Sequence, residues 1–150
     1  MPQSLSRVLT HLVFSTKDRA PFIKEHFGEQ LHAYLSGVLN NHRCVSIQAG
    51  GVADHVHLLF ALSRTMSIAE VVELVKTSSS KWIKLQDAAC TDFHWQSGYG
   101  AFSIGESEVP RLKQYIQNQP EHHRTLSFQD EFRRILELYG VSYDERFVWD

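Results

Sequence analysis

The order of apolar and polar positions along the chain predicts four strands. The segments 6–16, 44–49 and 52–62 are rich in β-branched and apolar residues, which is typical of strands. Gly50 and Gly51 separate the second and third segments, and a glycine pair between two strands indicates a hairpin turn. A short fourth strand is expected over Gly100 to Ile104.

Helical spacing appears between and after these strands. Phe27, Leu31 and Leu35, followed by Val38 or Leu39, predict a first helix within residues 22–41. Ser67 and Glu70 form a capping-box pattern that starts a second helix of about five turns. A third helix opens at residues 107–110 and stops near Pro120, and a last one covers residues 126–139 with Gly140 as its C-cap.

The resulting order is βαββαβ with two further helices. This order predicts an α+β, ferredoxin-like fold, in which an antiparallel sheet carries helices on one face and C-terminal helices are added. With 150 residues, 43% of them hydrophobic, the chain is expected to form one domain over residues 1–150.

Composition narrows the class of protein. The sequence holds no apolar run of the roughly 18 to 20 residues that a membrane span requires, so we expect a soluble, cytoplasmic protein without membrane contact. Cys44 and Cys90 lie far apart and outside any CxxC pattern, so reduced, structural thiols are expected. A net charge of -2 argues against non-specific coating of duplex DNA, although residues 7–24 carry a local excess of basic side chains.

His55 and His57 are the strongest chemical signal in the chain. They flank Val56 on a predicted strand, so alternation places both imidazoles on one face and the valine on the other. Imidazole nitrogens bind divalent transition metals, and they serve Mg when phosphate oxygens and waters complete the shell. An incidental pair on a sheet surface would explain His-x-His alone equally well.

Tyr115 and Gln119 are four residues apart, so a helix places them on the same face. The amide oxygen of Gln119 is a suitable hard ligand, and the phenol of Tyr115 is a potential nucleophile toward phosphate. For a single tyrosine in a helix, packing against the core is the more common role.

Four segments together resemble the single-tyrosine HUH transposases of the insertion-sequence 200/605 family. They are Asp54–Leu59 (DHVHLL), Lys76–Ser80 (KTSSS), Trp95–Ser103 (WQSGYGAFS) and Tyr115–His123 (YIQNQPEHH). The resemblance extends nearly from end to end and includes relatives that process repetitive extragenic palindromes. The order and spacing of the four segments are more specific than any one segment alone.

The resemblance implies a metal-dependent enzyme that cuts and rejoins single-stranded DNA hairpins. Tyr115 would be the nucleophile that forms a 5′-phosphotyrosine, and His55, His57 and Gln119 would hold Mg or Mn. It also implies a homodimer, commonly with the histidines of one subunit and the tyrosine helix of the other in each active site.

Other polar residues have weaker assignments. Lys76, Ser79 and Lys81 on the second helix, with Arg111 on the third, are expected to contact DNA; a solvated helix face would explain the lysines equally well. His122 and His123 follow Pro120 and are expected to leave the face that carries Tyr115.

Two other functions remain open. A domesticated protein that binds DNA hairpins without cutting would have no need of both histidines, Tyr115 and Gln119. A metal hydrolase with an activated water would use the same histidines but would keep its activity in Tyr115→Phe.

Overall fold

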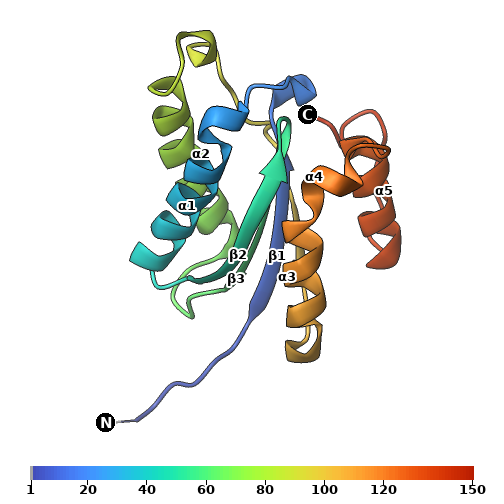
Figure 1. Cartoon of the computed structure of the whole chain (residues 1–150). Coiled ribbons are helices and arrows are strands. Elements are labelled where there is room, and N and C mark those ends of the chain that lie inside the picture. The colour runs from blue at the N-terminus through green and yellow to red at the C-terminus, as the bar shows by residue number, and fades with distance from the viewer. Residues whose placement is uncertain (1) are drawn as a thin grey trace.

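The computed structural model describes residues 2–150 and contains a four-stranded antiparallel sheet (Figure 1). The strands lie in the order β2-β3-β1-β4, with β1 and β3 in the centre. Their bounds are Leu9–Ser15 for β1, Val45–Val52 for β2, His55–Ala61 for β3 and Gly100–Ser103 for β4. The predicted ferredoxin-like α+β fold is therefore confirmed.

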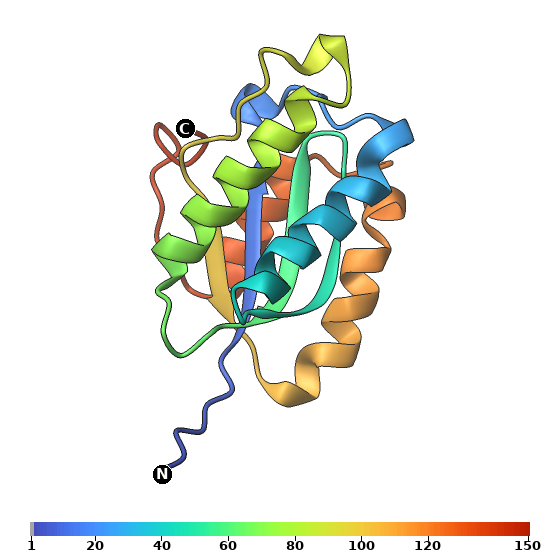
Figure 2. The same cartoon turned by 90° about the vertical axis from the view of Figure 1, so that its left-hand side faces the viewer.

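Helices cover both faces of this sheet. The first two, α1 (Glu25–Asn41) and α2 (Ile68–Lys84), lie side by side on one face, as Figure 2 shows. The C-terminal helices lie on the other face and are α3 (Val109–Gln117), α4 (Gln119–His122) and α5 (Phe128–Leu138) (Figure 1). Three short 3-10 turns lie in the connections between strands and helices. They are η1 (Lys17–Arg19) between β1 and α1, η2 (Ala88–Cys90) between α2 and β4, and η3 (Glu106–Glu108) between β4 and α3. Among the residues described, no helix is both long and apolar enough to cross a membrane.

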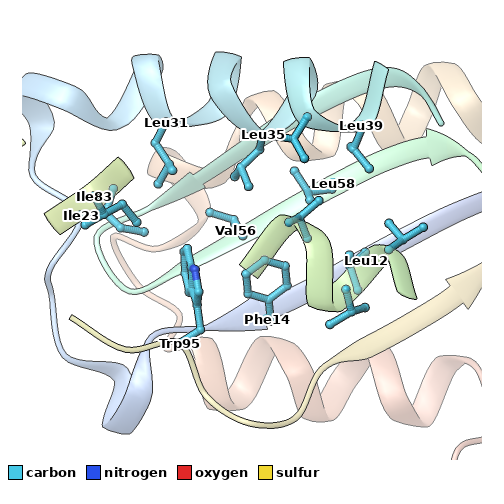
Figure 3. Packing of buried hydrophobic residues seen from close by; sticks show 14 of the residues in the cluster. Leu12, Phe14, Ile23, Leu31, Leu35, Leu39, Val56, Leu58, Ile83 and Trp95 are labelled. Atoms are coloured by element: carbon cyan, nitrogen blue, oxygen red, sulfur yellow. The ribbon is translucent and has the colours of Figure 1, made fainter. Parts of the chain in front are cut away.

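Strand alternation divides the core into two parts. Phe14, Val56 and Leu58 point toward α1 and α2, where they meet Leu31 and Leu35 (Figure 3). The opposite face has a smaller cluster, made by Val13 and Phe102 of the sheet with Phe128, Phe132, Ile135 and Leu136 of α5. The C-terminal helix is therefore fixed to the sheet by its own apolar face.

The helix ends largely follow the sequence signals. Ser67 and Glu70 form the predicted capping box at the start of α2. Ser127 caps α5, and Gly140 follows that helix with a φ of 66°, a conformation that favours glycine. The first helix begins at Glu25 rather than near Phe22, because the backbone amide of Ile23 bonds to the carbonyl of Ala53 and keeps this segment extended.

The predicted position of the hairpin turn was wrong. Gly50 and Gly51 lie inside β2, and the chain turns at Ala53 and Asp54. Gly50 is there because α3 crosses the sheet at this point: an added Cβ would lie 2.8 Å from both the carbonyl oxygen and Cγ2 of Ile116. A glycine here lets α3 approach the sheet closely.

Gly50→Ala should therefore destabilise the protein by about 1–3 kcal/mol, because the new methyl group forces α3 away from β2. Urea denaturation measures the change. Gly37→Ala is the matched control, since it lies within α1 with open space around it and should stabilise by about 0.5–1 kcal/mol. Equal stability of Gly50→Ala and the wild type would contradict close packing of α3.

Candidate metal and tyrosine site

The two histidines of β3 lie in the layer between the sheet and the C-terminal helices. Val56 between them is part of the core beneath α1 and α2, so His55 and His57 face the other way, as alternation predicts. Both are fully buried. Their environment is therefore set by the side chains that α3, α4 and α5 bring to them.

The predicted tyrosine and glutamine reach these histidines within the same chain. The ring centroids of His57 and Tyr115 are 5.8 Å apart. Gln119 begins α4, one residue after the break that ends α3, and its Oε1 lies 2.9 Å from His55 Nε2. One chain thus brings together all four residues singled out by the sequence.

Glu131 lies at the centre of the site, and the sequence analysis missed it. It comes from the first turn of α5, is only 1% exposed, and uses both carboxylate oxygens. Oε1 lies 3.0 Å from His57 Nε2 and 3.3 Å from His55 Nε2. Oε2 accepts hydrogen bonds from the Tyr115 hydroxyl and, at 2.9 Å, from Gln119 Nε2. The only signal in the sequence was an acidic residue at a position where the apolar face of the last helix continues.

The buried carboxylate controls the charge of its neighbours. Burial would raise the pKa of Glu131, but contacts with His123, His55 and His57 hold that pKa far below its usual value. Burial would lower the pKa of His55, but hydrogen bonds to Asp54 and Glu131 raise it to about 9. Burial, and then the charge of Glu131, raise the pKa of the Tyr115 phenol. Without an added cation, the site therefore favours a protonated phenol.

Outer residues fix the orientation of both imidazoles. Asp54 Oδ1 accepts a hydrogen bond of 2.7 Å from His55 Nδ1, which leaves Nε2 toward the site. His11 on β1 bonds to His57, with 2.8 Å between His11 Nε2 and His57 Nδ1. Burial, and then the neighbouring His57, lower the pKa of His11 to about 3, so His11 is neutral. Asp54 and His11 therefore act as orienting partners.

His123 also reaches the site, contrary to the expectation that it leaves the face of Tyr115. Its Nδ1 donates a hydrogen bond of 2.6 Å to the carbonyl of Leu126, so Nε2 is left to face the site. That Nε2 is buried, has no hydrogen-bond partner, and lies 3.2 Å from Glu131 Oε1. A ring nitrogen this close to a carboxylate oxygen needs positive charge between them, from a proton on Nε2 or from a metal ion.

The donor set fits a divalent metal ion. Nitrogen atoms of His55 and His57 and an oxygen of Glu131 lie within 4.8 Å of one another, and all three residues are buried. Two imidazoles and a carboxylate are a common ligand set for divalent transition metals. The predicted ligand Gln119 lies beside them, with its Oε1 toward His55.

A groove of about 850 Å³ leads to the site between α3 and α5. Tyr115 and Glu131 line it, together with Arg111, Arg134 and Tyr139. Its walls combine two guanidinium groups with aromatic rings. An anionic ligand with flat bases could therefore approach the tyrosine along this groove.

The residues expected to contact DNA fall into two groups. Lys76 is engaged internally, since its Nζ donates hydrogen bonds of 2.7, 3.3 and 2.7 Å to the carbonyls of Gln96, Ser97 and Gly98. Burial lowers the pKa of Lys76 to about 8. Ser79 is fully buried and accepts a hydrogen bond from the indole of Trp95, so the assignment of Ser79 to a DNA surface was wrong.

The other two residues are exposed. Lys81 lies on α2, across the sheet from Tyr115, whereas Arg111 lies on α3 at the groove and pairs with Glu108. Of the four residues, only Arg111 lies beside the tyrosine site.

Comparison with known protein families shows to which family the chain belongs. The model of the family described as "Transposase IS200 like" matches residues 4–119. The chain belongs to this family. Membership indicates an enzyme of DNA transposition. The matched residues include His55, His57, Tyr115 and Gln119 but end before α5, so Glu131 lies outside the part that defines IS200-like transposases.

Solved structures share the IS200-like fold. A candidate transposase from Deinococcus radiodurans R1 is 20% identical, with a TM-score of 0.61, over 79% of this chain and 98% of that one. A REP-associated tyrosine transposase bound to a REP hairpin is 12% identical, with a TM-score of 0.60, over 82% of this chain and 72% of that one. No curated protein matches the sequence.

Lys76→Met should destabilise this IS200-like transposase by about 1–3 kcal/mol, because the carbonyls of the loop 96–98 lose their donor. Thermal and urea denaturation measure the effect. Lys81→Met, on the same helix but exposed, should change stability by less than about 0.5 kcal/mol. An equal, small effect of both variants would show that Lys76 has no structural role.

Proposed function

We propose that the chain cuts and rejoins single-stranded DNA, with Tyr115 as the nucleophile and a divalent ion, Mg or Mn, held by His55, His57 and Gln119. The observation that carries the proposal is the meeting of these four residues in one buried cluster at the end of a groove. Family membership supplies the class of enzyme, and the cluster supplies the chemistry.

In the proposed reaction, the phenol oxygen of Tyr115 forms a bond to a DNA phosphorus, and the bond from phosphorus to the 3′ oxygen breaks. The products are a 5′-phosphotyrosine and a free 3′-OH. The phenol proton is released to water in the groove, and the departing 3′ oxygen takes a proton from water. A DNA 3′-OH reverses these steps and reseals the strand without ATP, since the phosphotyrosine conserves the energy of the broken bond.

The side chains around Tyr115 explain why a cation is needed. Burial and the charge of Glu131 raise the pKa of the phenol, which opposes loss of its proton. A divalent ion held by His55, His57 and Gln119 would supply positive charge that polarises the scissile phosphate and favours the phenolate. The protein holds His55 and His57 ready for this role through Asp54 and His11.

The substrate we propose is a single strand that extends from a DNA hairpin. One neighbour in fold is a tyrosine transposase bound to a REP hairpin, and the groove of this chain carries aromatic rings and two arginines, which Glu108 and Glu131 balance in charge. Arg111 and Arg134 would contact phosphates, and Tyr139 would stack on a base.

A homodimer is part of the proposal, but each subunit would complete its own site. Tyr115 lies beside His57 of the same chain, with 5.8 Å between ring centroids. In this arrangement, dimerisation would pair two hairpin-binding subunits and would supply no side chain to the partner's site.

Tyr115→Phe should abolish covalent attachment to a labelled hairpin oligonucleotide in Mg or Mn, because the nucleophilic oxygen is removed. His57→Ala should do the same by weakening metal binding. Denaturing gels detect the adduct. Tyr143→Phe, in the exposed C-terminal segment, is the control and should match the wild type. Strand cleavage that persists in Tyr115→Phe would favour a water-activating metal hydrolase, and binding without cleavage by the wild type would favour a non-cutting hairpin binder.

Co-expression of Tyr115→Phe with His57→Ala tests whether one chain completes the site. Differently tagged subunits allow the mixed species to be purified and assayed for adduct formation. We expect no recovery of activity, because every subunit lacks one essential residue of its own site. Recovery in the mixed species would instead show that the tyrosine of one subunit acts with the histidines of the other.

A further inference from the structure

We propose that Glu131 is a ligand of the metal ion, so that the C-terminal helix supplies an anionic ligand from outside the part of the chain that matches the family. This inference rests on the proposed function, since it concerns the same ion. It changes the ligand set from two imidazoles and an amide to one that carries a full negative charge.

The first argument is the position of Glu131 Oε1. This single oxygen faces His57 Nε2 at 3.0 Å and His55 Nε2 at 3.3 Å, the two nitrogen atoms that the metal would use. Asp54 engages the other nitrogen of His55, and His11 engages the other nitrogen of His57. Both imidazoles are thus oriented toward the carboxylate oxygen.

The second argument comes from His123. Its Nδ1–H is donated to the carbonyl of Leu126, so the buried Nε2 faces the site, lies 3.2 Å from Glu131 Oε1 and lacks a hydrogen-bond partner. An unprotonated nitrogen and a carboxylate oxygen repel each other at this distance, so a proton on Nε2 or a metal ion must lie near both. Positive charge is therefore favoured on the side of Glu131 that His55 and His57 also face.

The two carboxylate oxygens have different partners. Oε2 accepts from the Tyr115 hydroxyl and from Gln119 Nε2, whereas Oε1 faces the imidazoles. One side chain can therefore bind the ion through Oε1 and position the nucleophile through Oε2. The apolar face of α5 fixes this arrangement, because Phe128, Phe132 and Ile135 pack beneath the sheet.

An anionic ligand predicts that the ion binds before DNA. Without Glu131, the site would rely on the substrate phosphate to supply negative charge. With Glu131, two buried imidazoles and a carboxylate supply three protein ligands, one of them anionic, before DNA binds. The imidazoles favour Mn²⁺ over Mg²⁺, because nitrogen is a softer donor than oxygen.

The test is calorimetric titration of Mn²⁺ into the full-length protein without DNA. We expect one ion per chain in the wild type and at least a roughly tenfold weaker affinity in Glu131→Gln, which keeps the size of the side chain and removes its charge. Glu137→Gln, on the exposed side of the same helix, is the matched control and should bind as the wild type does. Equal affinities of the wild type and Glu131→Gln would overturn the inference.

His57→Ala separates this inference from the proposed function. If His57→Ala loses Mn²⁺ while Glu131→Gln keeps it, the metal site stands and the role of Glu131 fails. If the wild type binds no ion, both the inference and the metal part of the proposed function fail.

Crystals of the wild type soaked in Mn²⁺ provide a test that needs no variant. Anomalous density within about 2.3 Å of Glu131 Oε1 is the expected result. An ion at full occupancy that lies farther than this from Glu131 Oε1 would overturn the inference, even if Glu131→Gln could not fold.

Discussion

The carboxylate of Glu131 is the constraint on which the site depends. A buried negative charge is costly unless hydrogen bonds and positive charge surround it, and here His55, His57, Gln119 and Tyr115 all turn toward it. The same group therefore ties β3, α3, α4 and α5 together. It also holds the phenol and the imidazoles within reach of one another before any substrate binds.

The two faces of the sheet have different roles: one stabilises the fold, and the other carries the polar site. Toward α1 and α2 the strands present a large apolar core, whereas toward α3 to α5 they present His11, His55 and His57 beside a smaller apolar cluster. The glycine at position 50 lets α3 pack closely against the edge strand. Polar chemistry in a buried layer is thus possible because the opposite face stabilises the sheet.

Much of this could be predicted from local patterns. Alternation placed His55 and His57 on one face, and the capping box fixed the start of α2. Tyr115 and Gln119 do meet, at Glu131 Oε2, although the single helix expected to carry both is divided at Asn118 into α3 and α4. These signals lie within one element or in a specific family pattern.

The errors have a common physical cause. The roles of Glu131, His123, Ser79 and Gly50 depend on contacts between elements far apart in the chain: Glu131 with His57, Ser79 with Trp95, and Gly50 with Ile116. Local spacing carries no information on such contacts. For His123, the turn after Pro120 continues as α4 and brings the imidazole back to His55, with 4.5 Å between ring centroids.

The most direct test of the account is to identify the residue that becomes attached to DNA. The wild type would be trapped with a hairpin oligonucleotide in Mn²⁺, digested with trypsin and nuclease, and analysed by mass spectrometry. The account predicts a nucleotide attached through its 5′ phosphate to the peptide Gln114–Arg124, in which Tyr115 is the only tyrosine. Cleaved DNA with attachment to another residue, or with no attached residue, would contradict it.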